Sequence, residues 1–387
     1  MKAKNTLLTT LLSCFLFSFL MFNSHQAMAE EILLDSQPPS KPFRIAMFYP
    51  RDAPFWTSFI NLMQAAANDL GIELLTFSAQ GNRLLMKQQF LSVLDGKNKV
   101  DAVVFNNYKD SASQFIKLAN DAKVFSFLVN SAMTEERYRE MGKPREKYPF
   151  WIGQMLPDEV GANQKITNIL IDEAKLISKS STINVVGVNG PISSGAAIMR
   201  FNALKETLKF HENVNLLQVV NSESWNEEEA SLKFQALMKR YKKATVVWAG
   251  SARLVDGILQ GEKQLNLKAG QDYFTGGIGF KQSMLNAIAN GQVCATAGGH
   301  YIEGAWALVL LYDYLTGIDF MEHGVELLTP MGLVTKDNIA LYLDNLIAEK
   351  WTSSNLKKID FRRYSKVYNP RMEQYNFDFD SIVLQLY

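Results

Sequence analysis

The chain has 387 residues, enough for two or three domains of ordinary size with sizeable cores. Forty Lys and Arg residues balance 39 Asp and Glu residues, so the chain lacks the excess of basic residues that nucleic-acid binding needs. Two cysteines and four histidines leave little material for a disulfide framework or a metal cluster. We therefore expect no nucleic-acid partner, no metal and no cofactor.

The first 29 residues have the pattern of a cleavable secretory signal. Two lysines precede an apolar run over residues 7–22, and an Ala-Met-Ala sequence at 27–29 supplies the small residues of a cleavage site. The run is shorter than the ~20 residues that a membrane-spanning helix needs. Lipidation at Cys14 is the alternative, although the most apolar stretch follows that cysteine. We expect cleavage after residue 29 and export to the periplasm.

Export changes the charge and the cysteine count. The 358 mature residues carry 38 basic and 39 acidic side chains, a formal charge of −1. Cys294 becomes the only cysteine, so no intrachain disulfide can form. It lies in a Val-Cys-Ala-Thr run that is typical of a buried strand, and we expect it to be buried and unpaired.

Short β-branched or aromatic runs alternate with segments of helical period after a Pro-rich lead at residues 30–42. The first series predicts strands and helices in turn at 44–49, 56–70, 73–77, 83–94, 102–105, 111–122 and 124–130. Gly71 is placed to end the first helix. This alternation is typical of βαβ units and a parallel sheet.

A second series of similar length follows a polar stretch at residues 134–149. It predicts helices and strands at 161–177, 183–188, 196–210, 215–220, 227–241, 244–248, 282–289 and 293–297. A strongly apolar helix at 301–315, short strands at 325–328 and 332–334 and a helix at 338–350 complete the body. The last 37 residues carry eight aromatics, which we expect to pack on that body because exposed aromatics promote aggregation.

Several motifs stand in a fixed order along residues 45–334. They are Tyr49-Pro50 with Pro54-Phe55-Trp56, a Gln-Gln pair at 88–89, a Val-Asp-Ala run at 100–106, an arginine helix after Gly190, residues 291–296 and Glu303-Gly304. Together they resemble the type I periplasmic solute-binding proteins of the ribose- and galactose-binding type. The Tyr-Pro opening, a lone Arg200 and Val334-Thr335-Lys336 are similar to the subgroup that includes the periplasmic autoinducer receptor.

The resemblance implies a fold of two doubly wound parallel-sheet α/β lobes joined by three hinge crossovers near Gly153, Gly298 and Thr329. The N-terminal lobe would comprise residues 43–153 and 299–328, and the C-terminal lobe residues 154–298 and 329–336. Residues 337–387 would form a C-terminal helix and aromatic tail.

In such a fold the ligand binds between the lobes, at the carboxyl ends of the strands. We expect Phe55 and Trp56 to offer flat faces to a sugar ring, with hydrophobic packing as the alternative. The arginine fork of Arg200 suits oxygen-rich ligands, with an ordinary ion pair as the alternative. The remaining candidates follow other strands and are Asn106, Asn107, Asn130, Ser251, Arg253 and His300. For the asparagines, turn capping is the alternative.

The chain departs from sugar binders after the strand that ends near Ala249. Sugar binders usually carry an Asn-Asp or Thr-Asp pair there, whereas this chain has Gly250-Ser251-Ala252-Arg253. Since an acceptor is replaced by a cation, we expect a roomier, less acidic pocket and an anionic or larger ligand rather than a neutral pentose.

Enzyme motifs are incomplete: the glycines at 190 and 195 lack the Lys and Ser/Thr of a phosphate loop, and no GxSxG, HExxH or CxxC motif occurs. We expect no catalytic residues, and an exported hydrolase is the least favoured reading. The leading hypothesis is a monomeric periplasmic protein that binds a sugar or sugar acid and presents its closed form to the permease of an ABC transporter. The alternative is a receptor that partners a membrane histidine kinase or another signalling protein.

Overall fold

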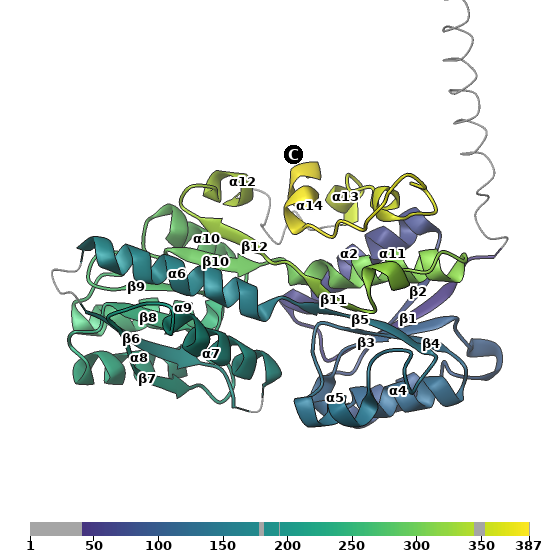
Figure 1. Cartoon of the computed structure of the whole chain (residues 1–387), viewed down its shortest axis with the longest axis horizontal. Coiled ribbons are helices and arrows are strands. Elements are labelled where there is room, and N and C mark those ends of the chain that lie inside the picture. The colour runs from purple at the N-terminus through teal and green to yellow at the C-terminus, as the bar shows by residue number, and fades with distance from the viewer. Residues whose placement is uncertain (1–40, 178–181, 193, 344–352, 387) are drawn as a thin grey trace, which may run out of the picture.

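In the computed structural model, two α/β lobes lie side by side and the chain passes between them three times (Figure 1). The structure describes residues 41–177, 182–192, 194–343 and 353–386. The signal sequence expected at 1–29 and most of the Pro-rich lead lie outside these residues. Among the described residues, no helix is both long enough and apolar enough to cross a membrane.

The N-terminal lobe is built on a six-stranded parallel sheet with the order β11-β5-β4-β3-β1-β2. Its strands are β1 (Arg44–Tyr49), β2 (Glu73–Ser78), β3 (Ala102–Phe105), β4 (Phe125–Val129), β5 (Trp151–Pro157) and β11 (Glu326–Thr329). Its helices are α2 (Pro54–Leu70), α3 (Arg83–Leu91), α4 (Ala112–Asp121), α5 (Glu135–Met141) and α11 (Glu303–Leu315).

Both faces of this sheet are covered, which explains the unbroken apolar runs of its central strands. Along β1, Ile45 and Met47 join the core formed with α2 and α11, whereas Ala46 and Phe48 join the core formed with α3 and α4. Helix α2 ends at Gly71 in the left-handed conformation, with φ of 68°, as the sequence predicts.

The C-terminal lobe is built on a second six-stranded sheet with the order β12-β10-β9-β8-β6-β7. Its strands are β6 (Ile183–Asn189), β7 (Val214–Asn221), β8 (Val246–Ala249), β9 (Phe274–Ile278), β10 (Ala295–Gly298) and β12 (Gly332–Thr335). All pair in parallel except β12, which is antiparallel to β10. Its helices are α6 (Glu159–Ile177), α7 (Gly195–Leu208), α8 (Glu227–Arg240), α9 (Ala252–Gly261), α10 (Gln282–Ala289) and α12 (Ile339–Leu343).

Short 3₁₀ turns connect some of these elements. They are η1 (Gly96–Asn98), η2 (Tyr108–Asp110), η3 (Glu262–Leu265), η4 (His300–Ile302), η5 (Met321–His323) and η7 (Phe361–Tyr364). Two further helices lie near the C-terminus, α13 (Ser353–Leu356) and α14 (Phe379–Gln385). Of the helix predicted at 338–350, the structure has α12, and residues 344–352 lie outside the described ranges.

The sequence suggested a first crossover near Gly153, but the structure places it after Pro157. Strand β5 continues to Pro157 within the N-terminal sheet, and the chain enters the other lobe at α6. Gly153 is needed inside β5 because a Cβ there would lie 2.8 Å from the ring of Phe127. The other two passages join β10 to α11 and β11 to β12.

Cys294 is a free thiol that is partly buried just before β10, and burial raises its pKa to about 12. A thiol with this pKa is almost entirely protonated at neutral pH, so Cys294 is a poor nucleophile.

Candidate functional site

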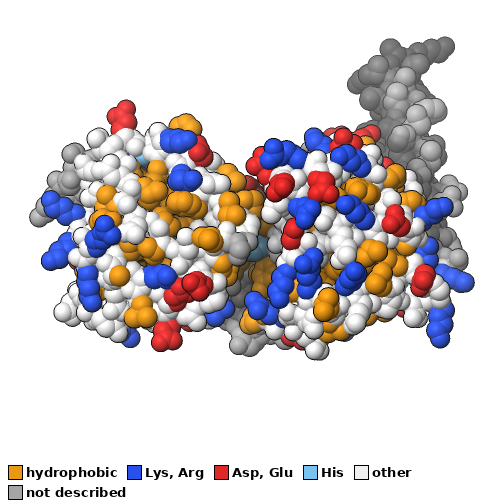
Figure 2. Space-filling view, turned by 90° about the horizontal axis from the view of Figure 1, so that it is seen from below, with side chains coloured by type: hydrophobic (Ala, Val, Ile, Leu, Met, Phe, Trp, Pro, Cys, Tyr) orange, Lys and Arg blue, Asp and Glu red, His pale blue; other side chains and the backbone are white. Residues whose placement is uncertain are grey.

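A groove separates the two lobes on the face seen from below (Figure 2). The parallel strands of both sheets direct their carboxyl ends toward the junction of the lobes, where loops and helix N-termini collect. Side chains from both lobes and from the crossovers meet there, and they include charged, aromatic and unpartnered polar groups.

A buried ion pair forms the centre of the C-terminal side. Arg200 on α7 donates from Nε to Oε2 of Glu159 and from Nη2 to Oε1, both at 2.6 Å. Its Nη1 donates to the carbonyl oxygen of Gly250 at 2.8 Å. The side chains of Arg200 and Glu159 are only 8% and 3% exposed. The arginine therefore bonds to its own protein at all three nitrogens, and its charge is balanced by Glu159.

Local structure explains how these two residues meet. Glu159 opens α6 directly after the first crossover, where the helix N-terminus favours an acidic residue. Arg200 faces inward from the second turn of α7, whose N-cap is Ser194. The guanidinium also lies 5.6 Å from the ring centroid of Trp225, a cation–π arrangement that leaves an aromatic surface beside the pair.

His300 connects the ion pair to the N-terminal lobe. Its ring lies 5.0 Å from that of Phe55, which stands at the start of α2. Burial is the main reason that the pKa of His300 is lowered to about 4; the charge of Glu159 opposes the shift and that of Arg200 adds to it. The imidazole is therefore neutral at neutral pH, and its buried Nδ1 has no hydrogen-bond partner within the described structure.

Glu303, at the start of α11, is a fully buried carboxyl group at the hinge. Asn130 at the end of β4 and Thr329 at the end of β11 face it, but neither carboxyl oxygen has a partner at good hydrogen-bond geometry in the described chain. Burial raises the pKa of Glu303 well above its usual range, and the negative charge of Glu159 raises it further. Asn130 holds a left-handed backbone, with φ of 66°.

The two asparagines after β3 have different surroundings. Asn106 is 4% exposed and its Oδ1 is buried with no partner among the described residues, so it has acceptor capacity to offer. Asn107 instead accepts from the backbone N–H of Ala112 at 3.0 Å and donates to the carbonyl of Ala132 at 2.9 Å. Both polar atoms of its amide therefore bond to nearby backbone groups, which is the turn-capping role given above as the alternative to ligand binding.

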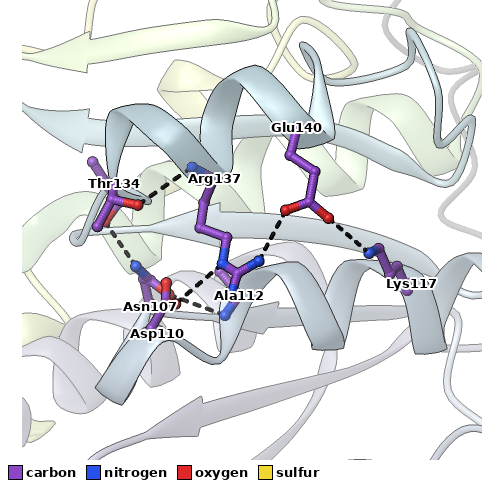
Figure 3. Close-up of polar contacts among 8 residues, drawn as sticks. Asn107, Asp110, Ala112, Lys117, Thr134, Arg137 and Glu140 are labelled. Atoms are coloured by element: carbon purple, nitrogen blue, oxygen red, sulfur yellow. Dashed lines mark hydrogen bonds and ion pairs between the residues drawn. The ribbon is translucent and has the colours of Figure 1, made fainter.

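Figure 3 shows how this capping joins a surface network between α4 and α5. Arg137 bridges Asp110 and Glu140, at 3.3 and 2.9 Å, and Lys117 adds a second contact to Glu140 at 3.5 Å. All of these charged side chains are more than 40% exposed, so the network holds α5 in place without adding much stability.

Three expected site residues have structural surroundings of their own. Trp56 is 8% exposed and packs beside Tyr49 and Phe59 in the core. Ser251 caps α9 by accepting from the N–H of Leu254. Arg253 is 59% exposed and pairs with Glu227 at 3.5 Å.

The structure therefore brings together Phe55, Asn130, Arg200 and His300 from the expected set. It adds Glu159, Trp225 and Glu303, which the sequence analysis did not select as ligand-binding residues. Glu159 and Glu303 stand at the starts of helices, where capping is the simpler reading of an acidic residue, so only their burial distinguishes them. No cluster of three or more potential metal ligands occurs within the described ranges.

Comparisons with known proteins agree with this architecture. The family model described as "Periplasmic binding protein domain" matches residues 45–319. A periplasmic sugar-binding protein from Pseudomonas fluorescens is similar in structure, with a TM-score of 0.74 and 26% identity, covering 88% of this chain and 99% of that chain. No curated protein is similar enough in sequence to match the chain.

Two more distant solved structures share the fold. A galactofuranose-binding protein has a TM-score of 0.65 and 18% identity, covering 79% of this chain and 98% of its own. The binding protein of the arabinose ABC transporter from Shewanella sp. ANA-3 has a TM-score of 0.64 and 18% identity, covering 78% of this chain and 94% of its own. These likenesses confirm the type I architecture predicted from the motif order.

Proposed function

The chain belongs to the periplasmic binding protein family, a family of binding proteins rather than enzymes, and from that premise we propose that it binds a neutral sugar in the groove between its lobes. The Pseudomonas fluorescens protein, named as a periplasmic sugar-binding protein, supports the ligand class. The observation that carries the proposal is the buried Arg200–Glu159 pair, with the ring of Trp225 beside the guanidinium. The adjacent rings of Phe55 and His300 add an aromatic surface at the start of α2.

Sugars present hydroxyl groups around their edges and apolar C–H faces. Aromatic rings suit the faces, and a charged but balanced pair suits the hydroxyls because it offers fixed donors and acceptors. Arg200 has five N–H donors and uses three of them within the protein, so two remain. The unpartnered Oδ1 of Asn106 adds an acceptor, and the unpartnered Nδ1 of the neutral His300 adds a donor or an acceptor according to its tautomer.

The charge of the groove argues for a neutral ligand and against the anionic one that the sequence suggested. Glu159 balances Arg200 at 2.6 Å, His300 is neutral, and Arg253 is an exposed residue paired with Glu227. A sugar carboxylate bound here would lose its hydration without gaining an ion pair, because each cation named above already has an acidic partner.

The lobes would close over the sugar by rotation about the three crossovers, as two-domain binding proteins do. The closed form would then present a surface made of both lobes to a membrane permease of an ABC transporter, in the periplasm after removal of residues 1–29. Sequencing the N-terminus of the exported protein tests that cleavage, since it would begin at Glu30.

Titration calorimetry with neutral pentoses and hexoses and their uronic acids tests the ligand class. We expect a neutral sugar to bind, its uronic acid to bind more weakly, and Phe55→Ala to lower affinity about tenfold through loss of an aromatic face. Phe210→Ala is the matched control, because Phe210 is 84% exposed and has no place in the groove network. Tighter binding of the uronic acid, or equal affinities for the Phe55→Ala variant and the wild type, would refute the proposal.

A further inference from the structure

The C-terminal residues 355–386 cross the back of the hinge. In Figure 1, α14 lies above the junction of the two lobes, on the side opposite the groove that Figure 2 shows from below. A two-lobe fold with three crossovers does not require this segment, which returns from the C-terminal lobe to pack on the N-terminal one. We call residues 355–386 the C-terminal strap.

Aromatic stacking anchors the strap to the N-terminal lobe. Trp306 on α11 is fully buried, and its ring contacts those of Phe361, Tyr364 and Phe377 at centroid distances of 5.7, 4.6 and 5.1 Å. These contacts remove a large apolar area from water, so the strap moves with the N-terminal lobe.

Polar contacts strengthen the same anchor. Asp313 on α11 is fully buried and accepts from Ser365 Oγ, from the N–H of Lys366 and from the hydroxyl of Tyr375. The carboxylate of Asp69 on α2 accepts from the N–H of Phe361 at 2.8 Å. Cutting the strap from this surface would leave a buried carboxylate without partners, which makes detachment costly.

The tip of the strap touches the other lobe. Phe379, the first residue of α14, lies 5.7 Å from Phe280, which follows β9, and 5.6 Å from Tyr301 in the second crossover. The next residue, Asp380, accepts a hydrogen bond from the hydroxyl of Tyr342 on α12 of the C-terminal lobe.

Phe379 also presses on the hinge backbone itself. A Cβ built on Gly299 would lie 2.5 Å from the Phe379 ring, and one on Gly332 would lie 3.1 Å from it. Gly299 is the first residue after β10, with φ of 91°, and Gly332 opens β12 after the third crossover. The ring therefore occupies the space between two of the three crossovers.

We propose that the C-terminal strap governs lobe rotation, with Phe379 as a wedge that limits opening and the Asp380–Tyr342 contact as a tether that resists closure. Opening the groove brings the backs of the lobes together and compresses the wedge, whereas closing it separates them and stretches the tether. The strap thus sets how far the ligand-free protein opens. It also sets the free energy of closure, which lowers the apparent affinity for the ligand.

Interlobe distances in the sugar-free protein test this, so the outcome does not depend on the proposed ligand. Spin labels at Arg139→Cys on α5 and Asn202→Cys on α7 report the distance across the groove by double electron–electron resonance, both sites being exposed. Cys294 competes little for the label at neutral pH because its pKa is about 12.

Phe379→Ala is expected to add longer distances than the wild type shows, and the conservative Tyr342→Phe to add shorter ones. Phe234→Ala is the matched control: it deletes an equally buried ring outside the strap, on α8 and in contact with Tyr273, and it should lower stability with the distance distribution unchanged. Tyr342→Phe keeps the test decisive if Phe379→Ala fails to fold. Distributions that superimpose on the wild type in the folded variants would overturn the proposal.

Discussion

Removing one partner of the buried Arg200–Glu159 pair offers the sharpest test of how the groove is built. Arg200→Met preserves most of the side chain's length and deletes its charge. The carboxylate of Glu159, 3% exposed, then loses two hydrogen bonds of 2.6 Å and its only close cation among the described residues. Breaking a buried pair in this way costs about 3–5 kcal/mol, because the remaining charge stays desolvated.

The size of the effect follows from burial, and a matched pair on the surface shows this. Arg362 and Asp360 are joined through two nitrogens as well, at 2.9 and 3.3 Å, but their side chains are 53% and 35% exposed. Water stabilises both charges when the pair is broken, so Arg362→Met should cost about 1 kcal/mol or less.

Urea unfolding of both variants, followed by circular dichroism, measures these costs. The double variant Arg200→Met/Glu159→Leu should regain most of the loss seen with Arg200→Met alone, since it removes both buried charges. Two results would contradict a buried, mutually compensating ion pair. One is an Arg200→Met variant that loses no more stability than Arg362→Met; the other is a double variant that is about 3–5 kcal/mol less stable than Arg200→Met alone.

Three other predictions concern single residues. Glu303→Gln should stabilise the protein at pH 7–8. The native carboxyl has a raised pKa and stays protonated, whereas the unfolded chain releases this proton above the unfolded pKa, so the native state loses stability as the pH rises; thermal melts at pH 5 and pH 8 should show the gain at the higher pH. His300, with a pKa near 4 against 6.5 when unfolded, should lower stability by up to about 3 kcal/mol as pH falls from 6.5 to 4, and His300→Asn should abolish that slope in urea titrations. Trp306→Ala should cost about 3–5 kcal/mol by opening a cavity under the strap, and limited proteolysis should then cut residues 355–386 first; an intact strap in this variant would contradict the anchor assigned to it.

The fold was predictable because its signals are local and repeated. Alternating strands and helices, a helix ended by Gly71 and an ordered set of motifs identify two doubly wound lobes without any long-range information. Two strands escaped prediction for local reasons. Strand β5 contains Gly153, and β9 contains Gly276 and Gly277, which are poor strand formers in isolation. Gly276 is required there because a Cβ would lie 2.5 Å from the carbonyl oxygen of Ala295 on β10.

The site was less predictable because its chemistry depends on contacts between distant residues. The sequence placed Arg200 as a ligand-binding residue from its position after a strand, and that role stays a prediction. Its partner Glu159 is 41 positions away, and this pairing is the reason that we propose a neutral ligand instead of the anionic one expected from the sequence. Asn106 and Asn107 are identical in type and adjacent, yet only Asn107 is used in capping. No sequence pattern distinguishes the two side chains, because the partners of Asn107 are the backbone groups of Ala112 and Ala132, and only the fold brings Ala132 beside it.

A crystal structure of the protein with a neutral sugar that binds in calorimetry tests the central claim most directly. The account predicts the sugar ring in the groove, with a face against Phe55 or Trp225 and hydroxyls bonded to the free donors of Arg200, whose link to Glu159 stays intact. A sugar bound outside the groove, or an Arg200 released from Glu159 to bind an anionic group, would contradict it.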